Sequence, residues 1–246
     1  MYKRILLIVS LLAPGIVFAQ TDSVKRSGSV SLTGASISPG VGSKVVVVQA
    51  GVSNYLKYKN TDYTLDGTYL SARAVTKTSP EKVNDGSLIL QPRLLFNDWN
   101  IFAFSQVSKA YTRNLNFRYE SAIGGGKFIY KSTPFSIATS YAVLYDYSNY
   151  SEEIPGTSVD TKSWYRHSAR VKVLGKIDRV SYFAEFYYQP ELNKLSSYNY
   201  RYKLEAKSYI TKKLSMNILY NNSYETVVVN GNHTVSNLTF GLSIDY

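Results

Sequence analysis

The last ten residues, Asn237–Tyr246, alternate strictly between polar and apolar side chains. The apolar face carries Leu238, Phe240, Leu242, Ile244 and Tyr246. Period-two alternation predicts a β-strand with one apolar and one polar face. Terminal residues usually fray unless something ties them down. The last strand of an outer-membrane barrel is tied down because it must pair with the first, so the alternation favours such a barrel.

Almost every other segment of the chain also has the pattern of a long strand. We expect twelve strands at Val24–Ser38, Ser43–Tyr58, Thr61–Thr76, Gly86–Phe96, Trp99–Tyr111, Asn114–Tyr130, Thr133–Tyr147, Lys162–Leu174, Arg179–Gln189, Ser197–Ile210, Lys213–Glu225 and His233–Tyr246. The predicted fold class is therefore all-β, a transmembrane antiparallel up-and-down β-barrel of about twelve strands.

The lengths of the connections support this fold. Tight turns are expected at Lys59-Asn60, Asn97-Asp98, Lys131-Ser132, Gly175-Lys176 and Thr211-Lys212. Longer polar connections are expected at Lys77–Asp85, Ser148–Thr161, Pro190–Ser196 and Thr226–Asn232. Outer-membrane barrels have short periplasmic turns and longer extracellular loops. The connection near Thr112-Arg113 is too short to fit this alternation.

The N-terminus has the pattern of a secretory signal. Lys3 and Arg4 precede an apolar run, Ile5–Val17, and a small-x-small cleavage site ends at Ala19. We expect a signal peptide over residues 1–19 and a barrel over residues 20–246, placed in the outer membrane of a Gram-negative bacterium. The chain has no Cys, which excludes disulfides and thiolate metal sites.

The composition bears on the partners. The formal net charge of +11 would ordinarily raise nucleic acid as a partner, but export argues against it. Anionic solutes, outer-membrane lipid and the phosphates of lipopolysaccharide are the expected partners. The 23 Tyr suit a membrane barrel, which places aromatic residues in girdles at both interfaces.

The charged residues gather on one face of each predicted strand. A basic residue that faces lipid at the midplane costs roughly 2–4 kcal/mol, so we expect this face to line the lumen. A soluble sandwich would place the same face outside, and parity alone does not separate the two folds. The predicted lumen-lining residues are Arg93, Arg118, Glu120, Arg166, Arg170, Lys172, Glu185, Arg201, Lys203, Glu205 and Lys207.

Basic residues outnumber acidic ones in this set, for which Asp66, Glu120, Glu185 and Glu205 are the expected acids. A cation-rich lining attracts anions in a narrow pore. Alternatively, Arg and Glu from neighbouring strands interlock and fill the interior of a small barrel.

The segment Trp99–Tyr147 resembles the core of an outer-membrane family of unknown function that includes the putative salt-induced outer membrane proteins. The matching pieces are Phe102–Tyr111, Arg118–Tyr130 and Phe135–Tyr145. The resemblance implies a fold and a location, and no agreed activity. The segment Thr239–Tyr246 also resembles the signal that the barrel-assembly machinery recognises. That resemblance implies assembly roles for Thr239, Gly241, Ile244 and Tyr246.

The sequence offers little catalytic chemistry. The two histidines, His167 and His233, lack a Ser of matching strand parity for a nucleophile–base pair. The run Ile123–Lys127 fails the phosphate-loop pattern, and its glycines favour a bend or bulge. The acids Asp146, Glu152, Glu153 and Asp160 match no calcium loop. We expect no enzyme activity, no cofactor and no metal.

Two functions remain for a monomeric barrel. The first is a narrow channel with a basic, anion-favouring lumen. The second is a non-conducting structural or stress-related envelope protein that acts through its surface loops.

Overall fold

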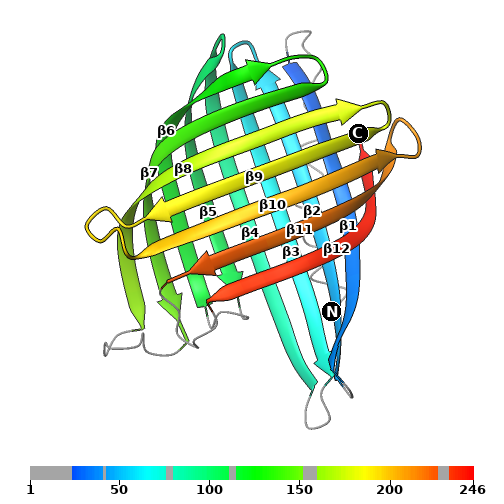
Figure 1. The fold of residues 1–246 in the computed structure, drawn as a ribbon, viewed down its shortest axis with the longest axis vertical. Coiled ribbons are helices and arrows are strands. Elements are labelled where there is room, and N and C mark those ends of the chain that lie inside the picture. The colour runs from blue at the N-terminus through cyan, green and yellow to red at the C-terminus, as the bar shows by residue number, and fades with distance from the viewer. Residues whose placement is uncertain (1–23, 41–42, 76–79, 111–114, 152–159, 227–232) are drawn as a thin grey trace.

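The computed structural model describes residues 24–40, 43–75, 80–110, 115–151, 160–226 and 233–246. The described residues form one closed barrel of antiparallel strands, in which each strand pairs with its sequence neighbours and β12 pairs with β1 (Figure 1). The strands are β1 (Val24–Gly40), β2 (Ser43–Tyr58), β3 (Thr61–Val75), β4 (Pro80–Phe96), β5 (Trp99–Ala110), β6 (Leu115–Lys131), β7 (Phe135–Tyr150), β8 (Thr161–Ile177), β9 (Val180–Pro190), β10 (Tyr198–Tyr209), β11 (Leu214–Glu225) and β12 (Thr234–Asp245). The predicted fold class is confirmed. The predicted signal peptide lies outside the described residues.

The barrel closes where β12 meets β1. The two strands pair from Ser29↔Asp245 to Gly34↔Phe240. The Tyr246 backbone extends this pairing, because its N–H donates to Gly28 O at 2.9 Å and its carbonyl accepts from Gly28 N–H at 3.1 Å. The Tyr246 ring lies against Gly28, where it occupies the space that a Cβ would need. The expectation that the terminal strand is tied down is therefore met.

Two-residue turns connect three of the hairpins, and each turn starts with a residue of positive φ. These residues are Lys59 (φ 51°), Asn97 (φ 54°) and Asp178 (φ 50°). Short hairpin loops need such left-handed residues because they match the twist of the strands. We call the end of the barrel that carries the connections after β2, β4, β6, β8 and β10 the turn side, and the opposite end the loop side.

The predicted turn at Gly175-Lys176 is wrong. Both residues continue β8, and the turn is Asp178-Arg179. Gly175 is inside the strand because the Tyr182 ring of β9 covers its α-carbon and fills the place of a side chain. The glycine therefore reflects a close approach of an aromatic ring and not a change of chain direction.

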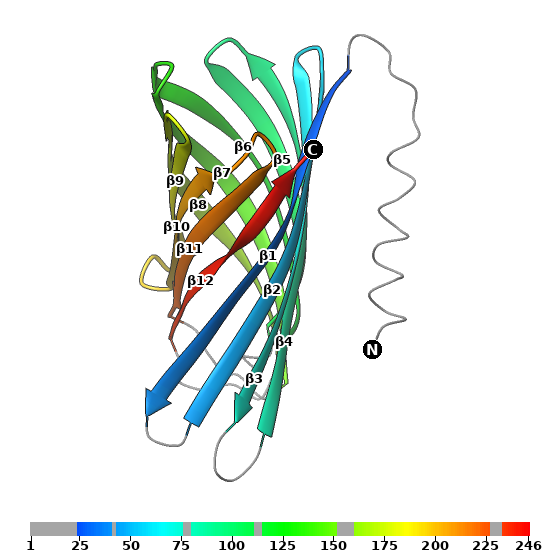
Figure 2. The same ribbon diagram turned by 90° about the vertical axis from the view of Figure 1, so that its right-hand side faces the viewer.

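The predicted connection Lys77–Asp85 is also wrong from Pro80 onwards, where β4 begins. Residues 80–85 of β4 pair with β3, whereas the pairing of β4 with β5 begins only at Gly86. The sequence pattern did not predict a strand here, because the polar residues of this stretch do not alternate with apolar ones. Figures 1 and 2 show that β1 to β4 project beyond the other strands on the loop side.

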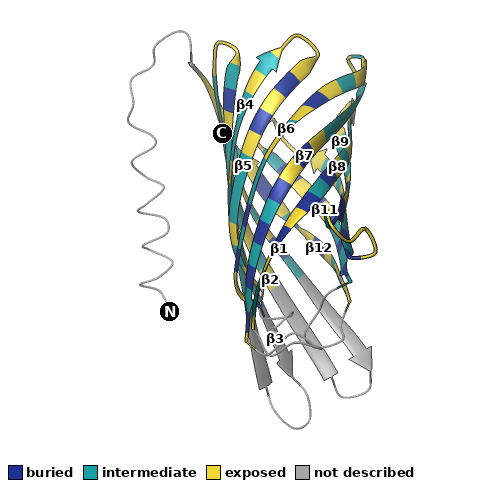
Figure 3. Cartoon of the chain, turned by 90° about the vertical axis from the view of Figure 1, so that its left-hand side faces the viewer, coloured by how far each residue is buried: buried dark blue, intermediate teal, exposed yellow. Residues whose placement is uncertain are grey.

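The outer surface of the barrel is apolar. Exposed and buried residues alternate along the strands (Figure 3). Exposed aliphatic and aromatic side chains include Leu32, Leu88, Leu90, Ile123, Val143, Val171, Phe186, Leu204, Ile218, Phe240 and Leu242. A soluble protein rarely exposes such a continuous apolar surface. The sandwich alternative, with these residues in a packed core, does not describe this chain.

The glycine run of β6 forms no bulge. Gly124, Gly125 and Gly126 pair in continuous register with β7, and the register shifts lie on either side, at Leu115/Phe117 and Phe128/Tyr130. A Cβ on Gly124 would collide with the backbone of β7 at Tyr141 and Ala142. The expected bulge is therefore absent at these glycines, and the two strands approach closely there. Within the described residues, no helix is long and apolar enough to cross a membrane.

Candidate functional site

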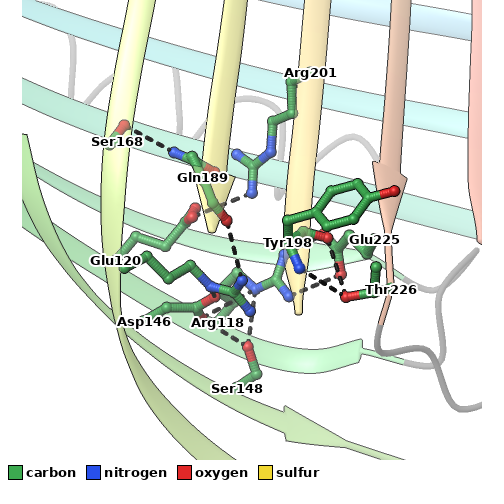
Figure 4. Close-up of polar contacts among 11 residues, drawn as sticks. Arg118, Glu120, Asp146, Ser148, Ser168, Gln189, Tyr198, Arg201, Glu225 and Thr226 are labelled. Carbon is green, nitrogen blue, oxygen red and sulfur yellow. Dashed lines mark hydrogen bonds and ion pairs between the residues drawn. The ribbon is translucent and has the colours of Figure 1, made fainter. Parts of the chain in front are cut away.

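An ion-pair cluster crosses the barrel interior near the loop side. Arg118 of β6 donates from Nη1 to Glu225 Oε1 at 2.7 Å and from Nη2 to Glu225 Oε2 at 3.1 Å. Glu225 ends β11, on the opposite wall, 107 residues further along the chain. Figure 4 shows the two side chains reaching toward each other across the interior. A bidentate guanidinium–carboxylate pair fixes both distance and orientation, so this pair ties the two walls together.

Asp146 of β7 holds two arginines of the cluster. Its Oδ1 lies 3.3 Å from Arg118 Nε, and its Oδ2 lies 3.5 Å from Arg166 Nε. Ser148 Oγ donates to Asp146 Oδ1 at 2.9 Å and accepts from Arg118 Nε at 2.8 Å. Asp146 and Ser148 are fully buried. A buried carboxylate needs such partners to offset the loss of its hydration.

A second pair links β10 to β6. Arg201 Nη2 donates to Glu120 Oε1 at 3.1 Å. We call the six charged residues Arg118, Glu120, Asp146, Arg166, Arg201 and Glu225 the arginine cluster. Five of the six are less than 5% exposed, and only Arg201 is partly exposed. Three cations face three anions, so the charges of the cluster balance.

The other predicted lumen residues lie closer to the turn side. Arg93 forms a bidentate pair with Asp62, with distances of 2.9 and 2.8 Å. Arg170 Nη1 lies 3.4 Å from Glu185, and Lys203 Nζ lies 3.5 Å from Glu205. Lys207 Nζ donates to both oxygens of Asp245, at 2.7 and 2.9 Å. Lys172 forms no ion pair in the described part of the chain.

Ten of the eleven predicted lumen residues form ion pairs in the described part of the chain, and their partners include acids that sequence reasoning missed. Asp62, Asp146, Glu225 and Asp245 each neutralise at least one predicted basic residue. Their positions within the strands could have identified such acids. Asp62 is an even number of residues from Asp66 and so shares its face, and Asp245 lies on the polar face of the last strand. Most of the expected cationic excess disappears when these acids are counted.

The four predicted assembly-signal residues lie along β12 and at its end. Thr239 is fully buried, and Ile244 is 56% exposed on the outer face. A Cβ on Gly241 would collide with the backbone of β1 at Leu32 and Thr33. The residues thus have roles in closing the barrel, and their recognition by an assembly machinery stays a prediction.

The histidines do not form a catalytic pair with the neighbouring serines. His167 lies on the outer face, where its Nδ1 is hydrogen-bonded to the Tyr141 hydroxyl, while Ser168 accepts from Gln189 on the inner wall. His233 contacts the Glu225 carbonyl at 2.8 Å. Among the described residues, no group of three or more His, Asp or Glu could hold a metal ion. Of the acids considered for calcium, Asp146 belongs to the arginine cluster, and Glu152 and Glu153 lie outside the described residues.

Known proteins resemble this chain in structure and not in sequence. No protein-family model and no curated protein matches the sequence. The NanC porin is similar in structure with a TM-score of 0.53 at 12% identity, over 89% of this chain and 98% of that one. An outer membrane channel from Pseudomonas putida F1 is similar with a TM-score of 0.51 at 10% identity, over 93% of this chain and 98% of that one. At such low identity, the likeness shows that the chain has the fold of outer-membrane β-barrels.

Proposed function

We propose that the protein is an outer-membrane channel of narrow bore that favours small anions. The observation that supports this function is a closed barrel with an apolar outer face and a charged inner wall. The apolar face suits lipid, because every backbone polar group of a closed barrel is satisfied between strands. Export by a signal peptide over residues 1–19 and a monomeric barrel in contact with lipopolysaccharide belong to the same proposal.

The anion preference is proposed from lysines and not from the arginines. Each inward-facing arginine of the predicted set has a carboxylate partner within 4 Å. Paired charges contribute little to the field in a pore, since the fields of the two partners cancel at a distance. Lys172, without an ion pair, lies in the half of the inner wall nearer the turn side and would attract anions there.

The arginine cluster favours a second candidate, a non-conducting envelope protein. The side chains of the cluster, hydrogen-bonded from β6 to β10 and β11, obstruct the interior near the loop side. A barrel filled in this way resembles the small barrels whose side chains fill the interior. Under this candidate, the barrel is a scaffold for its loops. An envelope role such as the resemblance to the salt-induced outer membrane proteins implies belongs to the proposal under either candidate, although no family model matches the sequence.

Conductance of the refolded barrel in a planar lipid bilayer separates the two functions. We expect small steps whose reversal potential in a salt gradient shows anion preference. Lys172→Glu together with Lys176→Glu should shift that potential toward cations. The control is Lys127→Glu, which changes the charge of an exposed lysine whose ammonium group lies over the outward Trp99 ring. A folded barrel that stays silent would overturn the channel, and an unchanged potential in the double variant would overturn the anion preference.

A further inference from the structure

Lysines line the inner wall of β8 and β10 in rows toward the turn side. The register places Lys172, Glu185 and Lys203 side by side on β8, β9 and β10. Four residues nearer the turn side, Lys176, Ser181 and Lys207 form an equivalent row. We call Lys172, Lys176, Lys203 and Lys207 the lysine face. Side chains in register on one face of a sheet are close neighbours, so the lysine face brings like charges together.

Two aromatic rings hold the lysines in these positions. The Phe183 ring has Lys172 Nζ at 5.2 Å and Lys203 Nζ at 5.3 Å from its centroid. The Tyr209 ring has Lys176 Nζ at 5.4 Å and Lys207 Nζ at 5.2 Å from its centroid. A ring face attracts an ammonium group and leaves its charge uncompensated. Each ring therefore keeps two cations near each other without neutralising them.

Three acids near the lysine face are already engaged. Glu185 pairs with Arg170, Glu205 with Lys203, and Asp245 with Lys207. In the described part of the chain, Lys172 and Lys176 form no ion pair. Two lysines are thus left without an ion pair on the inner wall. Glu185 lies opposite Lys172. However, the charges of Arg170, Arg93 and Lys203 repel the Lys172 ammonium group, and this local positive charge favours the arrival of an anion.

Two cavities open at the lysine face, and Lys176 lines both. The first has a volume of about 350 Å³, and its lining includes Lys176, Lys207, Ser136 and Ser181, with Glu205 as its one acid. The second has a volume of about 590 Å³ and adds Arg179 and Lys212, opposed by Asp178 and Asp245. Hydroxyl donors and ammonium groups around one cavity suit an oxyanion with several acceptor oxygens. The combined volume exceeds what a single inorganic anion needs and leaves room for a small organic group.

We infer that the lysine face is a binding site for small dianionic oxyanions, in particular phosphate esters. Lys176 lines both cavities and contacts the charged group, and Lys172, which lines neither cavity, adds its positive charge from deeper in the barrel. Ser136 and Ser181 donate hydrogen bonds to its oxygens. The inference deepens the proposed function, since it names the solute class that would enter from the turn side. Binding itself does not require that the barrel conduct.

Equilibrium binding to the refolded full-length barrel in detergent tests the site. Inorganic phosphate is titrated in a calorimeter at constant ionic strength, with acetate as the monoanionic comparison. We expect saturable phosphate binding that is stronger than acetate binding. Lys176→Gln should weaken it by about tenfold, and Lys172→Gln by a smaller factor, because Lys172 lies outside the cavities. Lys127→Gln is the matched control, because its ammonium group lies over the outward Trp99 ring.

The outcomes separate this inference from the proposed function. Saturable binding by a barrel that is silent in bilayers would support the site and overturn the channel. Anion-preferring conductance without saturable phosphate binding would support the channel and overturn the site. Equal binding of phosphate and acetate, or phosphate binding that is unchanged in both lysine variants, would indicate only non-specific electrostatic attraction. Either result would overturn the inference. Gel mobility of the folded barrel verifies that each variant is folded.

Discussion

The two ends of the barrel interior carry charge in different ways. Near the loop side, the arginine cluster joins three cations to three carboxylates in buried contacts that cross between opposite walls. Toward the turn side, the lysine face sets ammonium groups against aromatic rings and leaves two of them without an ion pair. Arginine suits the first role because its planar fork matches a carboxylate, and lysine suits the second as a compact point charge.

The difference shows that the charges of one inner wall serve two purposes. The cluster is a structural element, because its bonds connect strands that are not neighbours in the sheet. Apart from the pair of Lys207 with Asp245 of β12, the contacts of the lysine face stay within β8 to β10, and so it contributes less to holding the barrel together. Substitutions in the arginine cluster should therefore change mainly the free energy of unfolding, and substitutions in the lysine face should change mainly the affinity for anions.

The largest effect is expected from Glu225→Ala, which removes the carboxylate that reaches Arg118 across the interior. Breaking one side of a buried ion pair costs about 3–5 kcal/mol in the free energy of unfolding. The neighbouring Asp146, 3.3 Å from Arg118, should keep the loss near the lower end. The measurement is urea unfolding of the refolded barrel, followed by the fluorescence of the buried Trp164. A loss below about 1 kcal/mol would contradict a structural role for the cluster.

An intermediate effect is expected from Asp146→Asn. The amide keeps the shape of the side chain and loses the charge that faces Arg118 and Arg166, so the cluster is left with a net positive charge. Losing hydrogen bonds to a charged group costs about 1.5–3 kcal/mol. The same unfolding assay measures it, with Ser148→Ala as the comparison that removes one hydroxyl and no charge. An equal loss in the two variants would show that charge is not what matters at this position.

The smallest effect is expected from Glu205→Gln on the turn side. Its partner Lys203 is 42% exposed, and exposed ion pairs contribute less than about 1 kcal/mol to stability. The free energy of unfolding should therefore change little, whereas phosphate affinity should rise because Lys203 becomes free. Unfolding and calorimetric titration of the same preparation measure both quantities. A large loss of stability would remove the distinction between the two ends.

Much of the fold was predictable, because alternation is a local property. The bounds of β2 match those expected, and every predicted strand exists. The errors occur where residue type misleads. Gly175 is a residue type common in turns, but it lies inside β8 beneath the Tyr182 ring. Residues 80–85 belong to β4 although polar and apolar residues do not alternate there. Which residues of a strand share the charged face was also predictable, because alternate residues of a strand point to the same side.

The pairing of the inner residues was not predictable. Arg118 and Glu225 are 107 positions apart, and no sequence period connects them. Which carboxylate meets which guanidinium depends on strand tilt and on how the opposite walls approach, both of which are properties of the closed sheet. The distinction between a balanced loop side and a lysine-rich turn side therefore required the three-dimensional arrangement.

The join between β1 and β12 has a consequence for how the barrel forms. Among the described residues, its register contains six residue pairs, fewer than that of any other two neighbouring strands. It also brings together parts of the chain that are far apart, since the Tyr246 hydroxyl donates to Asn54 over 192 positions. Contacts between such distant segments form late, because all the intervening chain must first be arranged. The barrel is thus closed last at its shortest strand pairing. We expect partial unfolding to begin by separation of β12 from β1.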